Sequence, residues 1–187
     1  MGRSKRRIGP CWEATRAAGL TRYYVLFFIK LSNRRVHVAG ITEYPHGEWM
    51  KQVGRNVTDA FDGLLLNIRY LILDRDKIHT EAFRDLLKNA GVKPVRLPPR
   101  SPNLNAYAER FVRTIKEGCL DRMIFFGEDS LHTAINEFMA YYHHERNHQG
   151  LGNRLIDPQE KVGAADGSVE CRERLGGLLR YYYRQAA

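Results

Sequence analysis

Cysteine is scarce in this sequence of 187 residues, and no long apolar run occurs in it. The three cysteines, Cys11, Cys119 and Cys171, lie far apart and form no CxxC pair. A disulfide framework or a zinc site needs closely spaced or paired cysteines, so this distribution argues against both and fits a reducing compartment. The longest apolar run, residues 23–29, is much shorter than the roughly 20 residues that span a membrane.

The N-terminal stretch MGRSKRRIGP is basic but is followed by no apolar segment, so it does not have the form of a secretory signal. Internal repeats and low-complexity segments are also absent, and residues 163–167 are the only obvious flexible joint. We therefore expect a cytoplasmic protein. Its length suits one well-buried domain rather than two.

Positive charge is in excess. The formal net charge is +9, and the isoelectric point is about 9.6. Such a balance favours a polyanionic partner, with nucleic acid ahead of a membrane surface. A soluble protein that is basic for no functional reason is the alternative, and charge alone does not separate the two.

Hydrophobic periodicity predicts an α/β order of elements. Residues 23–29 are apolar without alternation, which is typical of a strand buried on both faces. Residues 35–42 alternate polar and apolar side chains and complete a hairpin. The later elements are a helix over 48–65, a strand over 70–73, a helix capped by Thr80 and ended by Gly91, a strand over 93–97, and helices over 104–120 and 130–144. This order predicts an α/β fold with a mixed sheet.

Two acids stand at positions that suit chemistry. Asp74 ends the strand over 70–73, and open α/β sheets place ligands at that edge. Asp74 also begins the sequence Asp-Arg-Asp, which an ordinary surface turn would use equally well. Glu109 follows 35 positions further on, with 34 residues between the two acids, near the start of a predicted helix.

The polar face of that helix carries Glu109, Arg113 and Lys116, at positions i, i+4 and i+7. One interpretation is a carboxylate beside two cations that meet phosphates. The other is a solvated face with an acid–base pair, which is common on helices. The spacing itself leaves both open.

Three segments, LILDRDKIHTEAF, SPNLNAYAERFVRTIKEGCL and YYHHERNHQGLGNRLIDP, decide between these readings by their order and spacing. Together they resemble the integrase core domain of DDE-type insertion-sequence transposases and retroviral integrases. The resemblance implies an RNase H-like α/β fold, in which antiparallel hairpin strands precede strand–helix alternation and helices cover both faces of the mixed sheet. It predicts a basic start over 1–11, a catalytic core over 12–160 and a C-terminal tail over 161–187.

The same resemblance implies an enzyme in which Asp74 and Glu109 are catalytic and bind metal together with a third acid on the first strand. No Asp occurs before Asp59, and Glu13 lies at about the expected position, so Glu13 is the candidate. The alternatives are that Glu13 is an exposed terminal acid or that the segment with the true acid is missing. The cofactor would be Mg²⁺ or Mn²⁺, as two ions, because hard cations prefer oxygen ligands and a pair of them assists phosphodiester exchange.

By the same resemblance, Arg113, Lys116 and Asn105 contact DNA, and the loop over 100–105 matches a mobile active-site loop. The implied function is DNA cleavage at transposon ends, followed by strand transfer, in which a 3′-hydroxyl end is joined to target DNA. The resemblance also implies a homo-oligomer on DNA, and no membrane partner is expected. The alternatives are a catalytically weakened relic that still binds DNA, a nuclease of the same fold, and a basic structural protein. The uncertain third acid, and a chain that begins close to the catalytic core, favour the relic.

Other residues attract non-catalytic predictions. Four residues of the third segment, Tyr142, Arg146, His148 and Leu151, are expected to pack rather than react. Neighbouring His143 and His144 point about 100° apart on a helix, so we expect an exposed surface there rather than a metal site. Residues 178–183 form a helix or a strand of unassigned function.

Overall fold

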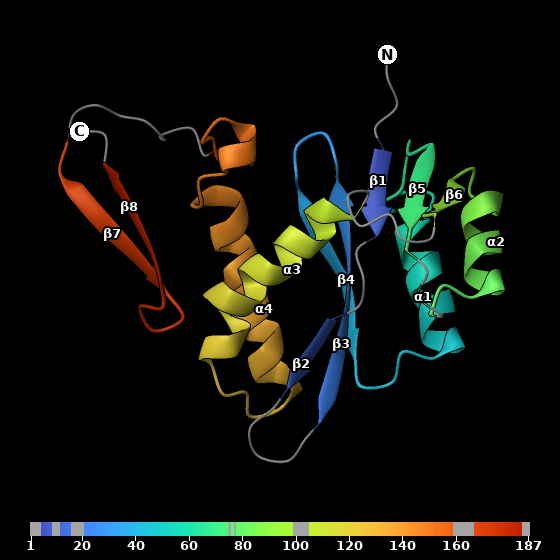
Figure 1. Cartoon of the computed structure of the whole chain (residues 1–187), viewed down its shortest axis with the longest axis horizontal. Helices are drawn as coiled ribbons and strands as arrows, with labels where there is room; N and C mark the ends of the chain where they lie inside the picture. Colours follow the sequence, from blue (N-terminus) through green and yellow to red (C-terminus); the bar gives the residue numbers. More distant parts are fainter. Residues whose placement is uncertain are drawn as a thin grey trace. The chain divides into compact units, whose positions relative to one another are not determined.

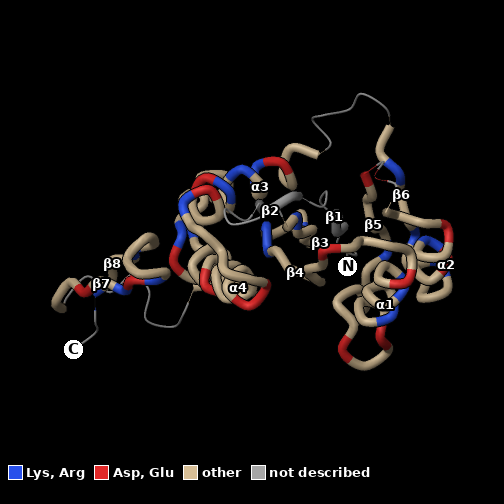
Figure 2. The backbone as a smooth tube through the Cα atoms, turned by 90° about the horizontal axis from the view of Figure 1, so that it is seen from below, with Lys and Arg blue, Asp and Glu red and all other residues tan. Residues whose placement is uncertain are grey.

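The fold is mixed α/β, as predicted (Figure 1). The computed structural model describes residues 5–8, 12–15, 21–74, 76, 78–98, 105–158 and 167–184, and of the first two ranges it describes the backbone alone. The chain divides into two compact units, residues 1–112 and 113–187. Figure 2 marks charged positions along the chain, and both signs occur on the helices of each unit.

The sheet of the first unit contains six strands. They are β1 (Lys5–Ile8), β2 (Trp12–Thr15), β3 (Arg22–Lys30), β4 (Val36–Thr42), β5 (Tyr70–Leu73) and β6 (Lys93–Arg96). The strand order is β2-β3-β1-β5-β6, and β4 also pairs with β3. Strands β1, β2 and β4 run antiparallel to β3, whereas β1, β5 and β6 are parallel to one another.

Strand β3 is buried on both faces, as its apolar sequence predicts. Leu26 and Phe28 point to one face and Phe27 to the other, and all three are almost fully buried. A β-bulge between Leu26 and Phe27 shifts the pairing with β4. The turn that joins β3 and β4 closes through Arg34, which has a left-handed backbone with φ of 63°.

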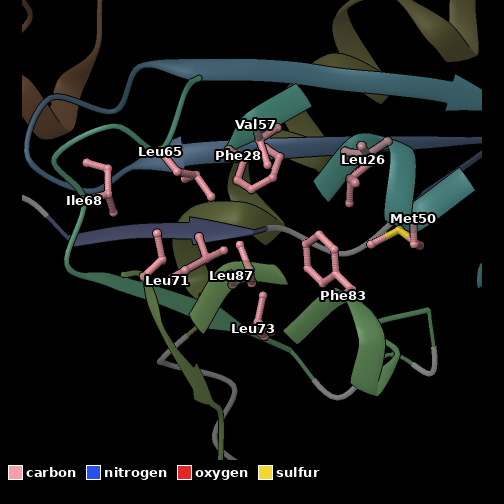
Figure 3. Packing of buried hydrophobic residues seen from close by; sticks show 12 residues of the cluster. Leu26, Phe28, Met50, Val57, Leu65, Ile68, Leu71, Leu73, Phe83 and Leu87 are labelled. Atoms are coloured by element: carbon pink, nitrogen blue, oxygen red, sulfur yellow. The ribbon is translucent and has the colours of Figure 1, made fainter. Parts of the chain in front are cut away.

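Two helices pack against one face of this sheet, α1 (Gly47–Val57) and α2 (Glu81–Asn89). The cluster shown in Figure 3 joins Met50 and Val57 of α1 and Phe83 of α2 to Leu26 of β3 and Leu71 of β5. Thr80 caps α2 as predicted, because its side chain accepts a hydrogen bond from the Phe83 N–H. None of the helices in the described ranges is long and apolar enough to cross a membrane.

The predicted helix over residues 48–65 was wrong in its second half, since α1 ends at Val57. The Thr58 hydroxyl donates to the Gly54 carbonyl, and the Asp59 carboxylate accepts hydrogen bonds from the N–H groups of Phe61 and Asp62. These local bonds compete with helical ones, so the chain turns instead. Phe61, which lies in the second half of the predicted helix, is 94% exposed.

Helix α3 (Ala106–Gly118) begins in the first unit and continues into the second. Its apolar stripe is buried at Ala108, Phe111 and Ile115, as the periodicity predicts. The second unit adds a 3₁₀ turn η2 (Leu120–Arg122), the helix α4 (Glu128–His144), a 3₁₀ turn η3 (Gln149–Leu151), and a hairpin of β7 (Val169–Arg174) and β8 (Leu179–Arg184). Residues 178–183 are therefore mostly strand, and they pair with β7, a strand that the sequence did not reveal.

An ion-pair network joins this hairpin to α4. Arg174 donates to both carboxylate oxygens of Glu145, Arg172 adds a third contact, and Arg174 also reaches Glu137. Glu145 is 4% exposed. Burial opposes ionisation of Glu145, but the hydrogen bonds from Arg174 and Arg172 outweigh it and lower the pKa of the carboxyl group. These contacts orient the hairpin within its own unit.

Tyr142, in the last turn of α4, and His148, which follows the helix, pack together, as predicted. Tyr142 and His148 are both buried, their ring centroids are 4.6 Å apart, and His148 Nε2 donates to the Tyr142 carbonyl oxygen at 2.8 Å. The expectation of an exposed surface at His143 and His144 was wrong. His143 is 8% exposed, and His144 is half-buried because its ring nitrogen bonds to the Asp157 carbonyl.

Candidate active site

Asp74 lies directly after β5, at the carboxyl end of a strand that is parallel to both of its neighbours. Leu71 and Leu73 anchor that strand in the core, so the position of the next residue is well defined. The Asp74 side chain is 14% exposed. Its Oδ1 atom accepts a hydrogen bond from the Asp76 N–H at 3.1 Å, a local bond of the kind that aspartates make in turns.

A second group holds the same oxygen. His79 Nε2 lies 2.9 Å from Asp74 Oδ1, and the His79 side chain is almost fully buried. The Asp76 carboxylate accepts from the Ile78 N–H, which shapes the turn that brings His79 back towards Asp74. Both hydrogen bonds to Asp74 therefore converge on Oδ1, and Oδ2 has none within the part of the chain that the structure describes.

Glu109 lies on the first turns of α3, where its side chain is exposed. Two contacts with the sheet hold this end of the helix. The rings of Phe27 on β3 and Phe111 are 4.9 Å apart, and the Arg34 guanidinium lies 3.5 Å from the centre of the Tyr107 ring. The Glu109 N–H also donates to the Asn105 carbonyl at the start of the helix. Glu109 is thus an exposed carboxylate on a fixed backbone.

The predicted DNA-contacting residues follow along the same helix. Arg113 is exposed and Lys116 is partly exposed, at the spacing that sets them on the side of α3 that carries Glu109. Figure 2 shows acidic and basic positions succeeding one another there. Asn105 Oδ1 is buried and has no hydrogen-bond partner within the described ranges. The predicted loop over 100–105 lies outside the described residues except for Asn105.

Glu13 lies on β2, which pairs with the same side of β3 as β1 does. Glu13 is opposite Tyr24, whereas Ile8 at the end of β1 is opposite Phe28, four residues away along β3. Four residues of strand span roughly 13 Å. Since β1 is the strand beside β5, this offset separates the Glu13 backbone from the level of Asp74. Its side chain lies outside the described residues, and its metal-binding role stays a prediction.

A divalent hard cation needs several oxygen ligands. Asp74 and Glu109 supply carboxylates of the right chemistry, and Asp74 has one oxygen uncommitted to hydrogen bonds with described residues. No group of three or more His, Cys, Asp or Glu side chains placed to hold a metal occurs among the described residues. The chemistry of each carboxylate thus suits a hard cation, and the described residues do not form a complete ligand set.

Sequence reasoning missed His79, Arg34 and Tyr107. His79 follows Asp74 by five residues, and its approach to the carboxylate depends on the turn between them, which periodicity does not describe. Arg34 stands in a hairpin turn where a solvated cation is the ordinary expectation. One sequence feature could have indicated the role of His79. This histidine directly precedes the helix cap Thr80, in the loop that follows Asp74 at the end of its strand.

Comparisons with known proteins agree with this fold. Residues 90–155 match a family model described as an integrase core domain, a range that includes Glu109 but not Asp74. The sequence matches none of the curated proteins with which it was compared. Two solved structures resemble the chain over 83% of its length. One is the HTLV-2 integrase catalytic core domain in complex with magnesium, of which 95% is covered, with 12% identity and a TM-score of 0.61. The other is the catalytic core domain of BIV integrase, of which 91% is covered, with 13% identity and a TM-score of 0.54.

A cryo-EM structure of the simian T-cell lymphotropic virus intasome, in complex with the PP2A regulatory subunit B56 gamma, also matches. The match covers 99% of the present chain and 68% of the matched intasome chain, with 12% identity and a TM-score of 0.58. At such identities the structural matches define the fold, and the family match defines the segment around Glu109. The fold of the chain is therefore similar to that of integrase catalytic cores, and residues 90–155 match an integrase core domain.

Proposed function

We propose that the chain is the catalytic core of a DNA integrase or transposase that cleaves phosphodiester bonds and joins DNA ends by metal-dependent phosphoryl transfer. The observation that carries this proposal is the placement of Asp74. It ends a buried parallel strand, and one of its carboxylate oxygens has no hydrogen bond to any described residue, in a fold similar to that of integrase catalytic cores. An RNase H-like sheet with helices on both faces belongs to the same proposal.

The residues have separate roles in it. Asp74 offers Oδ2 as a hard oxygen ligand from a rigid strand end, and Glu109 offers a second carboxylate from α3. Mg²⁺ or Mn²⁺ held there would stabilise the negative charge that develops on the attacking and leaving oxygens of the phosphodiester. Arg113 and Lys116 bind backbone phosphates of the substrate, and Asn105, at the start of the same helix, also contacts the DNA.

The net charge of +9 supports DNA as the substrate, because phosphate neutralisation dominates the affinity of DNA-binding proteins. We also propose that the protein acts on DNA as a homo-oligomer. One of the matched integrase cores is described as a trimeric form and another as a dimeric form.

A second candidate function is DNA binding without catalysis. The observation that favours it is the composition of β1, the strand between β3 and β5. It has the sequence Lys-Arg-Arg-Ile and contains no acid, while Glu13 lies on β2, opposite a β3 residue four positions from the partner of Ile8. A third metal ligand would then be missing beside Asp74, and the chain would hold DNA without cutting it.

The test is an assay with purified protein, labelled element-end DNA, a plasmid target and Mg²⁺ or Mn²⁺. We expect wild-type protein to nick the end and to join it to the target. Asp74→Asn and Glu109→Gln should lower both rates by at least about 10²-fold, because each removes a ligand oxygen charge from the site. Glu117→Gln is the matched control, since it makes the same charge change on an exposed position of α3.

Binding without nicking in either metal would contradict the enzyme and support the second candidate. Nicking without joining would identify a nuclease of the same fold. Glu13→Gln decides the third ligand separately, because unchanged activity in that variant removes Glu13 from the site.

A further inference from the structure

We propose that His79 is the positioning residue of Asp74, and that it orients the carboxylate so that Oδ2 faces a divalent cation. This inference rests on the proposed function of Asp74 and extends it to a histidine that no motif of the sequence singled out. The interaction is a hydrogen bond between His79 Nε2 and Asp74 Oδ1 at 2.9 Å.

The hydrogen bond restrains the one soft rotation of the carboxylate. An aspartate at a strand end turns freely about its Cβ–Cγ bond unless its oxygens are held. Here the Asp76 N–H and His79 Nε2 both bond to Oδ1, from the backbone and from a side chain. Two donors on one oxygen leave the other as the ligand atom, and groups that hold a ligand in this way tune its metal affinity.

His79 is itself held independently of any ligand. Its side chain is 2% exposed, and its ring stacks on Phe83 of α2 with centroids 6.0 Å apart and an interplanar angle of 27°. Its carbonyl oxygen accepts a hydrogen bond from Arg84 Nη1. The imidazole is therefore preorganised by the first turn of α2, and it transmits that order to Asp74.

The other ring nitrogen indicates why a histidine stands here. His79 Nδ1 is buried and has no hydrogen-bond partner among the residues that the structure describes. An orphaned polar atom in the core destabilises the fold, so a phenylalanine would pack against Phe83 at least as well. The bond to Asp74 is the interaction that the histidine ring makes and phenylalanine cannot. The benefit of His79 then lies at the carboxylate rather than in packing.

Mn²⁺ affinity tests this inference, measured on the full chain without DNA from the paramagnetic resonance signal of free Mn²⁺. We expect His79→Phe to bind Mn²⁺ about 10- to 100-fold more weakly than wild type, with an unfolding midpoint no lower than that of wild type. His79→Gln should restore most of the affinity, because its amide reaches the place of Nε2. His79→Asn, one methylene shorter, should not. His132→Gln is the control, an exposed histidine on α4.

A second readout does not depend on metal. In spectra of protein labelled with ¹⁵N in its histidines, the Nε2–H signal of His79 should shift in Asp74→Asn, whereas the His132 signal should not. An unchanged His79 signal would overturn the inference.

The outcomes separate the inference from the proposed function. If Asp74→Asn abolishes Mn²⁺ binding while His79→Phe binds as wild type does, Asp74 remains a ligand and the positioning role is wrong. If wild type and Asp74→Asn bind Mn²⁺ equally, the metal role of Asp74 fails, and the role of His79 fails with it. If His79→Phe does not fold, the Gln and Asn pair decides, and equal affinity in that pair contradicts the inference.

Discussion

At the scale of single residues, exposure and hydrogen bonding separate groups that the sequence presents alike. Cys119 is fully buried, and its thiol lies 3.9 Å from the Ala134 carbonyl oxygen, whereas Cys171 is exposed on β7. Burial raises the pKa of the Cys119 thiol to about 11. A thiolate is the reactive form, so the two cysteines should differ in chemistry.

The prediction is that, in a Cys11→Ser background, a thiol-reactive reagent at pH 8 labels Cys171 in native protein and labels Cys119 only after unfolding. Mass spectrometry of the labelled peptides measures this. Equal labelling of the two cysteines in native protein would contradict the burial of Cys119.

At the scale of elements, the ion-pair network at Glu145 orients the β7–β8 hairpin against α4. Glu145→Gln should destabilise the protein by about 2–3 kcal/mol, because it leaves the half-buried Arg174 with a weaker acceptor. Chemical denaturation gives the change in free energy of unfolding. Glu173→Gln is the control, since Glu173 pairs with Arg180 at the surface and should contribute less than about 1 kcal/mol.

The same carboxylate makes a pH prediction. The folded pKa of Glu145 is lower than the ordinary value of 4.5. Its stabilisation is therefore complete above pH 4.5 and is lost as the pH falls through the lowered pKa. Unfolding midpoints between pH 3 and 6 should fall more steeply in wild type than in Glu145→Gln, and parallel curves would contradict the lowered pKa.

His148 also contributes to the pH dependence of folding stability, at higher pH than Glu145. Burial lowers the pKa of His148, and its hydrogen bond to the Tyr142 carbonyl opposes this without cancelling it. A histidine with a lowered folded pKa stabilises the fold fully above its ordinary value of 6.5 and less as the pH falls below it. His148→Gln should therefore flatten the stability profile between pH 5 and 7 relative to wild type, and an unaltered slope would contradict this pKa.

Sequence patterns predicted most elements, and the misses have local causes. The apolar run of β3, the Thr80 cap of α2 and the buried stripe of α3 each depend on neighbouring residues, so periodicity detected them. The end of α1 at Val57 depends on the Asp59 turn, which overrides an apolar pattern that continues to Leu65.

The candidate site was predictable to the same extent. Asp74 and Glu109 stand at an element end and an element start, where spacing along the chain locates them. Their supports could not be read, because the His79 hydrogen bond and the Arg34–Tyr107 contact join residues through turns. Strand β7 alternates charged residues with few apolar ones, since its inward arginines meet glutamates rather than a hydrophobic core.

At the scale of the whole molecule, the net charge of +9 predicts salt-dependent binding to DNA. Each phosphate contact contributes roughly 0.9 to the slope of log K against log salt concentration. Arg113→Gln and Lys116→Gln should each reduce that slope by about this amount and weaken binding to all sequences alike. Fluorescence anisotropy over a salt series measures the slope, and Arg55→Gln on the exposed face of α1 should leave it unchanged. Slopes equal to that of wild type would exclude these two residues from the DNA interface.

The central claim is that Asp74 and Glu109 serve one active centre. The rate at which labelled element-end DNA is joined to a plasmid, in wild type, Asp74→Asn, Glu109→Gln and the double variant, tests it most directly. Residues that act as a unit have non-additive effects, so the double variant should be about as slow as the slower single variant. Losses that multiply in the double variant, or a single variant that joins DNA at the wild-type rate, would contradict a shared centre.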